Sequence, residues 1–254
     1  MNDRLRDSIK RTKQGFEESF QTGEFYNKQT QDETHLKRIL DFLPVREGMK
    51  ILDLGTGTGY LAFPLAEQYE RAEIVGLDIV EEALKENRVK AAEKGLENLE
   101  FVSYDGIGFP FEDNSFDMIV TRYALHHFPA IGDTFKEAQR VLRSGGNFFI
   151  SDPAPNDNDE QRFVDAYMQM KRDGHICFYT KAQWEEIGKE TGFVYSDGFE
   201  TNIRFPKKKE SAPELESILN RFDDEVIKGY DLEITDDEIW ITERVNNLLF
   251  VKEK

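Results

Sequence analysis

Apolar residues along the chain recur at two alternating spacings, which predict strands and helices in turn. Ile51, Leu52 and Leu54 form a short apolar run typical of a buried parallel strand, and apolar residues then recur at helical spacing over 61–66. This alternation continues to residue 152 and predicts a parallel sheet with right-handed helical crossovers, hence an α/β fold. The further strands are expected at 72–77, 98–104, 118–121 and 147–151, and the helices between them at 80–94 and 135–142.

Both ends of the chain add elements to this core. Helices are expected at 3–20 and 30–42, before the first strand, and at 160–173 and 181–191, after the fifth. Two last strands are expected, with a helical cap in the segment between them. These strands are predicted at 193–201 and 247–252, and the cap at 213–246.

The turn after the first strand carries the strongest chemical signal. In the stretch 50–60, Asp53 is followed by glycines at alternate positions, Gly55, Gly57 and Gly59. Glycines let a ligand approach the backbone closely, and the free amides of the following helix point outward as donors, so the turn is typical of a site for a nucleotide-like ligand. A dinucleotide-binding loop has a glycine where this chain has Tyr60, and Asp53 would repel a pyrophosphate.

The pattern Asp-x-Gly-x-Gly-x-Gly resembles motif I of the class I S-adenosylmethionine-dependent methyltransferases. Two later stretches are similar to that family as well: 109–117 (Phe-Pro-Phe-Glu-Asp-Asn-Ser-Phe-Asp) and 137–146, with Glu-Ala-x-Arg-Val-Leu-x-x-Gly-Gly. The resemblance covers about residues 35–152, with the motifs in the family's order. The segments 122–128 and 172–175 resemble the small-molecule branch related to ubiquinone and menaquinone biosynthesis methyltransferases.

The resemblance implies a Rossmann-like sheet of seven strands, mostly parallel with an antiparallel last strand. Helices would cover both faces, and N-terminal helices and a small helical cap would be added to them. The expected domain boundaries are 1–45 for an N-terminal helical lid and 46–254 for the methyltransferase domain, with core motifs at 48–152 and cap insertions at about 153–192 and 205–244.

The same resemblance implies residues that bind S-adenosylmethionine and its product S-adenosylhomocysteine. In the family the glycine loop wraps the methionine part of the cofactor, and the acid at the strand end helps to hold its ammonium group. Asp78, 19 residues after Gly59, would accept the ribose hydroxyls, although an aspartate there also suits a helix cap. Asp105 would bind the adenine amino group, and Tyr26 would belong to the lid or simply pack. The expected cofactor contacts are Tyr26, Asp53, Gly55, Thr56, Gly57, Gly59, Asp78, Ile79, Tyr104, Asp105, Gly106, Thr121 and Arg122.

Four residues are candidates for catalysis. Methyl transfer is an in-line displacement, so alignment and desolvation are the protein's main tasks, but an oxygen or carbon acceptor must also lose a proton. His126 and His127, after the fourth strand, and His175, near the cap, are the available bases, and Tyr123 is a rival polar group. The alternative for the histidine pair is a purely structural role. No metal site is expected, because two of the histidines are adjacent and no Cys or Glu completes a familiar spacing.

The amino-acid composition limits the classes of binding partner that are expected. Lys plus Arg number 33 against 50 Asp plus Glu, a net charge of −17 that disfavours nucleic acid and favours a small-molecule methyl acceptor. The basic run 207–209 is expected to be a solvated loop. No apolar run approaches the roughly 20 residues that span a bilayer, so no membrane association is expected. The single cysteine, Cys177, suits a reducing compartment, and we expect a cytoplasmic monomer or homodimer.

Two other functions stay open at this point. The glycine loop and Asp78 would also suit a nucleotide-dependent oxidoreductase, although Tyr60 and Asp53 argue against it. A protein that binds the cofactor without transferring a methyl group would have the same motifs.

Overall fold

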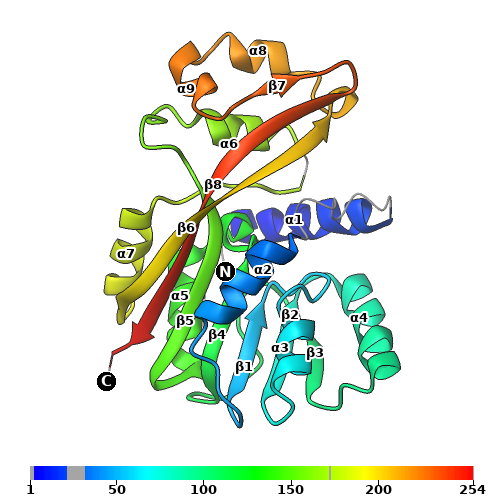
Figure 1. Cartoon of the computed structure of the whole chain (residues 1–254), viewed down its shortest axis with the longest axis vertical. Helices are drawn as coiled ribbons and strands as arrows, with labels where there is room; N and C mark the ends of the chain where they lie inside the picture. The colour runs from blue at the N-terminus through cyan, green and yellow to red at the C-terminus, as the bar shows by residue number, and fades with distance from the viewer. Residues whose placement is uncertain (1–2, 22–31, 172, 254) are drawn as a thin grey trace.

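The five predicted parallel strands form the larger part of a continuous sheet (Figure 1). The computed structural model describes residues 3–21, 32–171 and 173–253. In these residues the strand order is β3-β2-β1-β4-β5-β8-β6, and a two-residue strand, β7, pairs with β8 outside this path. The strands are β1 (Lys50–Leu54), β2 (Glu73–Asp78), β3 (Leu99–Ser103), β4 (Phe116–Arg122), β5 (Leu142–Ala154), β6 (Phe193–Lys208), β7 (Glu233–Ile234) and β8 (Glu238–Lys252).

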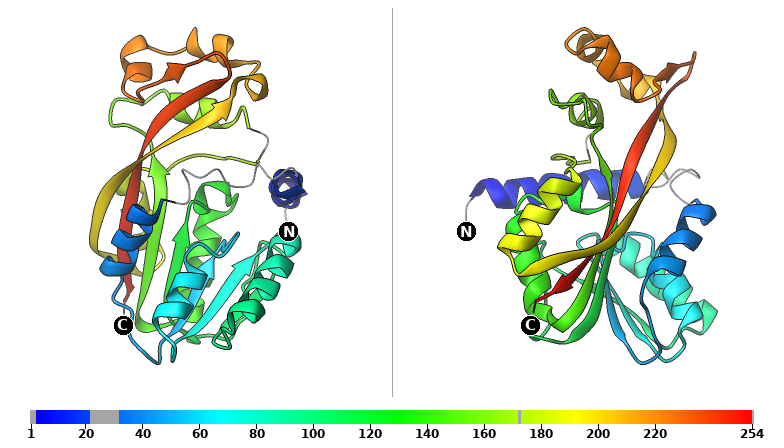
Figure 2. Two further views of the ribbon diagram at one scale, coloured as in Figure 1. Left: turned by 45° about the vertical axis from the view of Figure 1, so that its right-hand side comes forward. Right: turned by 60° about the vertical axis from the view of Figure 1, so that its left-hand side comes forward.

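Helices cover both faces of the sheet (Figure 2). The helices are α1 (Asp3–Gln21), α2 (Glu33–Phe42), α3 (Ala62–Gln68), α4 (Glu81–Lys94), α5 (Ile131–Val141), α6 (Phe163–Met168), α7 (Lys181–Glu190), α8 (Leu215–Leu219) and α9 (Asp224–Lys228). Residues from α2, α3 and α4 pack on one face, and residues from α5 and α7 pack on the other, in two separate apolar clusters. This arrangement explains why the central strands are apolar on both faces.

The parallel core and the antiparallel last strand are confirmed. β1 pairs in parallel with β2 and β4, and β8 enters between β5 and β6, antiparallel to both. Because parallel strands end at the same edge of a sheet, the carboxyl ends of β1, β2 and β4 come together. α1 crosses this edge of the sheet (Figure 1).

The last two strands are much longer than predicted. β6 and β8 stay paired from Phe193 with Lys252 to Lys208 with Glu238, so the hairpin continues past the sheet and forms part of the cap. The prediction of a loop at the basic run was wrong, because Lys207 is buried within β6. The prediction failed at Pro206, because a proline is also tolerated in an edge strand at a position where the backbone N–H would point away from the neighbouring strand.

A third apolar cluster holds the cap together. It joins α6, α8 and α9 to the far ends of the long hairpin, with Tyr167, Tyr230 and Ile241 among its fully buried side chains. α6 is shorter than the helix predicted over 160–173. The Asp159 carboxylate accepts the backbone amides of Phe163 and Val164, which fixes the first turn of α6.

Candidate active site

A pocket lies at the carboxyl ends of β1, β2 and β4. One wall comes from α1, through Ile9, Thr12 and Phe16. Sequence reasoning predicted the helix but not these three contacts, although their spacing places them on one face of α1.

The glycine loop forms the floor of the pocket. Gly55 has φ of +69°, and a Cβ added there would lie 2.6 Å from the Ala124 Cβ, so a larger residue would be strained and would clash. The loop is tied down by hydrogen bonds from the Thr56 hydroxyl to Asp53 (2.7 Å) and from the Gly57 amide to Asp78 (2.8 Å).

The two strand-end acids differ in their environment. Asp78 lines the pocket, and its carboxylate also accepts the amide of Val80, the residue that precedes α4, at 3.0 Å. Asp53 is buried and does not line the pocket. Burial raises the pKa of Asp53 to about 7 and also raises the pKa of Asp78.

The other expected cofactor contacts divide into three groups. Ile79, Tyr104 and Gly106 line the pocket with Gly55, Gly57 and Asp78, and a Cβ at Gly106 would lie 2.9 Å from a methyl group of Ile9 in α1. Tyr26 lies outside the described residues. The expected residues that do not line the pocket are Asp53, Thr56, Gly59, Asp105, Thr121 and Arg122.

Arg122 and Asp105 have other neighbours in the structure. The Arg122 guanidinium lies 3.8 Å from the ring centres of both Tyr60 and Tyr123, an aromatic sandwich that sequence reasoning missed. The Asp105 carboxylate accepts the amides of Ile107 and Gly108 in an exposed turn.

The structure separates the two adjacent histidines. His127 lines the pocket. Its ring and the Phe16 ring make an edge-to-face contact, with their centres 4.8 Å apart. His126 does not line the pocket, because its Nδ1 lies 2.8 Å from the Asp152 carboxylate, which also accepts the His126 amide at 3.1 Å. Both rings belong to a short 3-10 helix, Leu125–His127.

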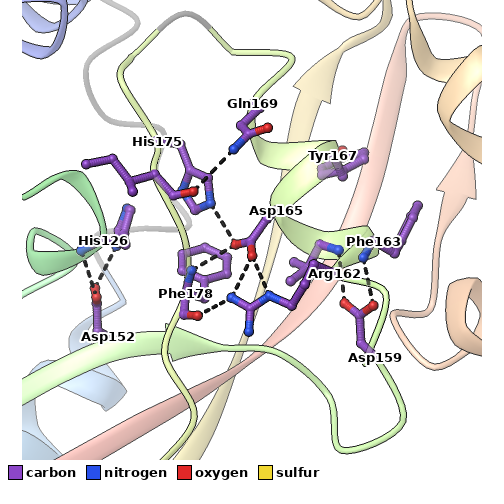
Figure 3. Close-up of polar contacts among 12 residues, drawn as sticks. His126, Asp152, Asp159, Arg162, Phe163, Asp165, Tyr167, Gln169, His175 and Phe178 are labelled. Carbon is purple, nitrogen blue, oxygen red and sulfur yellow. Dashed lines mark hydrogen bonds and ion pairs between the residues drawn. The ribbon is translucent and has the colours of Figure 1, made fainter. Parts of the chain in front are cut away.

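His175 is likewise held in a polar network away from the pocket (Figure 3). Its Nε2 lies 2.9 Å from the Asp165 carboxylate in α6, which also accepts the Phe178 amide and pairs with Arg162. The His175 and His126 ring centres are 5.3 Å apart, so the network supports the histidine pair from the cap side.

Burial governs the ionisation of this cluster. Desolvation lowers the pKa of His126 and of His127 well below the ordinary value for histidine, and burial raises the pKa of Asp152 to about 8. The His127 ring is therefore neutral at neutral pH. Across 3–21, 32–171 and 173–253, no group of three or more His, Cys, Asp or Glu side chains is arranged to hold a metal ion.

The strand order, the glycine loop after β1 and the acid that ends β2 define the architecture of the class I S-adenosylmethionine-dependent methyltransferases. The sequence matches a family model described as a methyltransferase domain over residues 45–193, which is more than half of the 254 residues. The chain belongs to this methyltransferase-domain family.

Individual relatives agree with this family. The chain is 31% identical over 149 residues to YcgJ of Bacillus subtilis, an uncharacterized methyltransferase, covering 58% of each protein. It is 34% identical over 113 residues to the ubiquinone/menaquinone biosynthesis C-methyltransferase UbiE of Paracoccus denitrificans, covering 44% of this chain and 45% of UbiE. The match thus spans only about half the length of these relatives.

Solved structures share the fold. The crystal structure of YcgJ superposes with a TM-score of 0.77 at 24% identity, over 88% of this chain and 100% of YcgJ. A phosphoethanolamine N-methyltransferase of Haemonchus contortus, solved with phosphomonomethylethanolamine and S-adenosylhomocysteine, superposes with a TM-score of 0.62 at 21% identity, over 87% of this chain and 53% of that one. Within the described part of the chain, no helix has the length and apolar character needed to cross a membrane.

Proposed function

We propose that this protein transfers the methyl group of S-adenosylmethionine to a small-molecule acceptor held beneath α1. The observation that carries the proposal is the pocket in which the glycine loop and the Asp78 carboxylate face the same space. Membership of the methyltransferase-domain family supports the reaction, and the Haemonchus contortus complex supports the cofactor.

The pocket residues fit this cofactor. Each oxygen of the Asp78 carboxylate accepts one backbone amide, from Gly57 or from Val80, and a carboxylate oxygen can accept a second hydrogen bond. Asp78 would therefore bind the ribose hydroxyls without releasing the loop. Ile79 and Tyr104 would supply apolar surface for the adenine ring.

The remaining expected contacts act around this centre. Asp53 does not line the pocket, so it would hold the ammonium group of the methionine part through a water molecule, and the nearby positive charge would favour the ionised form of Asp53 despite its burial. Gly55, Gly57 and Gly106 would allow close approach of backbone and ligand. Asp105 would bind the adenine amino group, and Thr56, Gly59, Thr121 and Arg122 would support the loop and the end of β4.

When bound, S-adenosylmethionine supplies a methyl group on a positively charged sulfur. The chain itself would align the acceptor with that methyl group and exclude water. α1 does both, because Ile9 closes against Gly106 on the cofactor side and Phe16 closes against His127 on the side of the histidine cluster. We therefore propose that α1 is the lid of the active site.

The acceptor would be a small molecule. The pocket is covered by α1, and a net charge of −17 opposes the approach of a nucleic acid. The single cysteine, Cys177, is consistent with a cytoplasmic setting for the reaction.

Calorimetric titration with S-adenosylhomocysteine tests the cofactor assignment. We expect wild-type protein to bind it, and Asp78→Ala to weaken binding at least about tenfold, since a buried hydrogen-bond acceptor is lost. Asp41→Asn, on the exposed surface of α2, is the matched control and should bind like wild type. Failure of folded wild-type protein to bind would refute the cofactor, and binding of NAD in its place would favour an oxidoreductase.

Methyl transfer itself requires a second experiment. Methyl-labelled S-adenosylmethionine is incubated with the protein and fractionated metabolites, and we expect label to appear in a small molecule. S-adenosylhomocysteine binding with no labelled product from any fraction would instead favour a protein that binds the cofactor without transferring its methyl group.

A further inference from the structure

A glycine in the segment between α6 and α7 lies directly against α1. Gly174 has φ of +81°, and a Cβ added there would lie 2.3 Å from the Thr12 hydroxyl oxygen and 2.8 Å from the Thr12 Cα. Real Cβ atoms do not come so close to other heavy atoms, so only a glycine leaves room for α1 at this point. Thr12 is buried and also lines the pocket. The segment therefore contacts the proposed lid at a residue that forms part of the pocket wall.

The chain around Gly174 is anchored to the cap. We call residues 173–178 the lid seat. The Asp165 carboxylate of α6 lies 2.9 Å from the His175 Nε2 and accepts the Phe178 amide at 2.8 Å (Figure 3). The His175 amide in turn donates to the Asp173 carboxylate at 3.2 Å. Because these contacts hold backbone amides as well as a side chain, they fix the course of the lid seat and not only its surface.

The lid seat is also bonded to the histidine turn beside the pocket. The Ile176 amide donates to the His126 carbonyl at 2.9 Å, and the His175 and His127 ring centres are 6.2 Å apart. Phe16, one helical turn after Thr12, makes the edge-to-face contact with His127. One face of α1 therefore rests on the lid seat and on the histidine turn, which are joined to each other by a hydrogen bond.

We infer that Gly174 is a positioning residue of the proposed active site: it lets Thr12 of α1 close onto the lid seat, and this contact sets how long the closed lid retains the cofactor. The inference rests on the proposed function, because it takes α1 as the lid of an S-adenosylmethionine pocket. Gly174 does not itself line the pocket. It acts on the ligand only through Thr12 and the position of α1.

The cap would thereby control the release of the reaction product. A ligand beneath a lid leaves only when the lid opens, so the dissociation rate follows the opening of α1. A contact that favours the closed state slows this step although it does not reach the ligand. The release of S-adenosylhomocysteine is therefore predicted to depend on a residue that lies in the segment between α6 and α7.

Gly174→Ala tests the lid seat, and Gly48→Ala is its matched control. Both glycines have φ of +81°, so an alanine strains the backbone alike at the two positions. At Gly48, however, nothing lies within 4 Å of an added Cβ. The comparison between the two variants therefore separates the contact with Thr12 from backbone strain.

Two measurements follow the lid, one with ligand and one without. In stopped-flow experiments, S-adenosylhomocysteine should dissociate about tenfold faster from Gly174→Ala, which corresponds to about 1.4 kcal/mol lost from the closed state. In ligand-free protein, hydrogen exchange followed by mass spectrometry should show faster exchange of the α1 amides in Gly174→Ala. Gly48→Ala should match wild type in both measurements, and urea unfolding checks that both variants are folded.

A substitution in α1 tests whether Gly174 acts through Thr12. Thr12→Ala removes the hydroxyl oxygen nearest to the added Cβ, while the Thr12 Cα and Cβ remain at 2.8 and 2.9 Å. The double variant should therefore release S-adenosylhomocysteine more slowly than Gly174→Ala, although still faster than wild type. Should Gly174→Ala fail to fold, Thr12→Ala alone loses part of the contact with the lid seat and should speed the exchange of the α1 amides.

The outcomes separate this inference from the proposed function. Equal dissociation rates and equal α1 exchange in Gly174→Ala and Gly48→Ala would overturn it, and so would a double variant that releases the ligand as fast as Gly174→Ala. If folded wild-type protein does not bind S-adenosylhomocysteine, the cofactor assignment fails instead. Exchange of α1 in the ligand-free variants would then still decide whether Gly174 positions this helix.

Discussion

Replacing Glu243 with glutamine should stabilise the protein, and the gain should grow with pH. Glu243 lies in β8 at 1% exposure, and its Oε1 has no hydrogen-bond partner among the described residues. Burial raises the pKa of Glu243 from 4.5 to about 8, although the nearby Lys207 acts in the opposite direction. In the unfolded chain the carboxyl ionises near its ordinary pKa, so folding must return a proton to it at neutral pH.

The sign and size of this stability gain follow from proton linkage. A pKa raised in the folded state contributes stability that is fully present below about pH 4.5 and is lost as the pH rises toward 8. Each pH unit in this window costs about 1.4 kcal/mol of unfolding free energy. Because the glutamine side chain does not titrate, the advantage of Glu243→Gln should grow by about 3 kcal/mol between pH 5.5 and pH 8.

Urea unfolding at these two pH values, followed by circular dichroism, measures the difference. The lower pH is still above the sequence pI of about 4.8. At the pI the net charge is zero, and the protein would tend to precipitate. Glu100→Gln, at an exposed position of β3, is the matched control and should show no such growth. Parallel pH dependences for Glu243→Gln and wild type would refute the reasoning, because Glu243 would then titrate alike in the folded and unfolded chains.

Two further substitutions test the pocket walls. Gly55→Ala should lower the unfolding free energy, measured in urea, by about 2 kcal/mol or more, because residue 55 has a positive φ and the added Cβ would lie 2.6 Å from the Ala124 Cβ. Adding Ala124→Gly removes that contact and should restore part of the loss. If it restores nothing, backbone strain at residue 55 is the sole cause. Phe16→Ala removes the α1 side chain that contacts His127. Stopped-flow measurements should then show S-adenosylhomocysteine dissociating about tenfold faster. An unchanged dissociation rate would exclude α1 as the lid.

The central sheet and the cofactor loop could be predicted from sequence because their determinants are local. A buried parallel strand needs a continuous apolar run, and the turn after β1 needs glycines where the backbone has positive φ. The spacing from Gly59 to Asp78 is likewise set by one helix and one strand. These features depend on neighbours along the chain, so one sequence is enough to indicate them.

The division of roles between His126 and His127 depends on contacts from distant segments. Asp152 of β5 holds one ring, and Phe16 of α1 meets the other. Lys207 is a similar case, because a lysine next to a proline suggests an exposed loop until α6 is placed beside it. In the structure the Lys207 ammonium donates to the Tyr167 carbonyl at 2.9 Å.

The continuous hairpin of β6 and β8 has a consequence for anyone who remodels this protein. One end of the hairpin belongs to the sheet, where β8 pairs with β5, and the other end carries the cap. Side chains alternate between the faces of a strand, so deleting one residue from either strand would turn every later side chain to the opposite face. The cap can therefore be shortened, extended or exchanged for that of a relative only in steps of two residues per strand, matched across the pair.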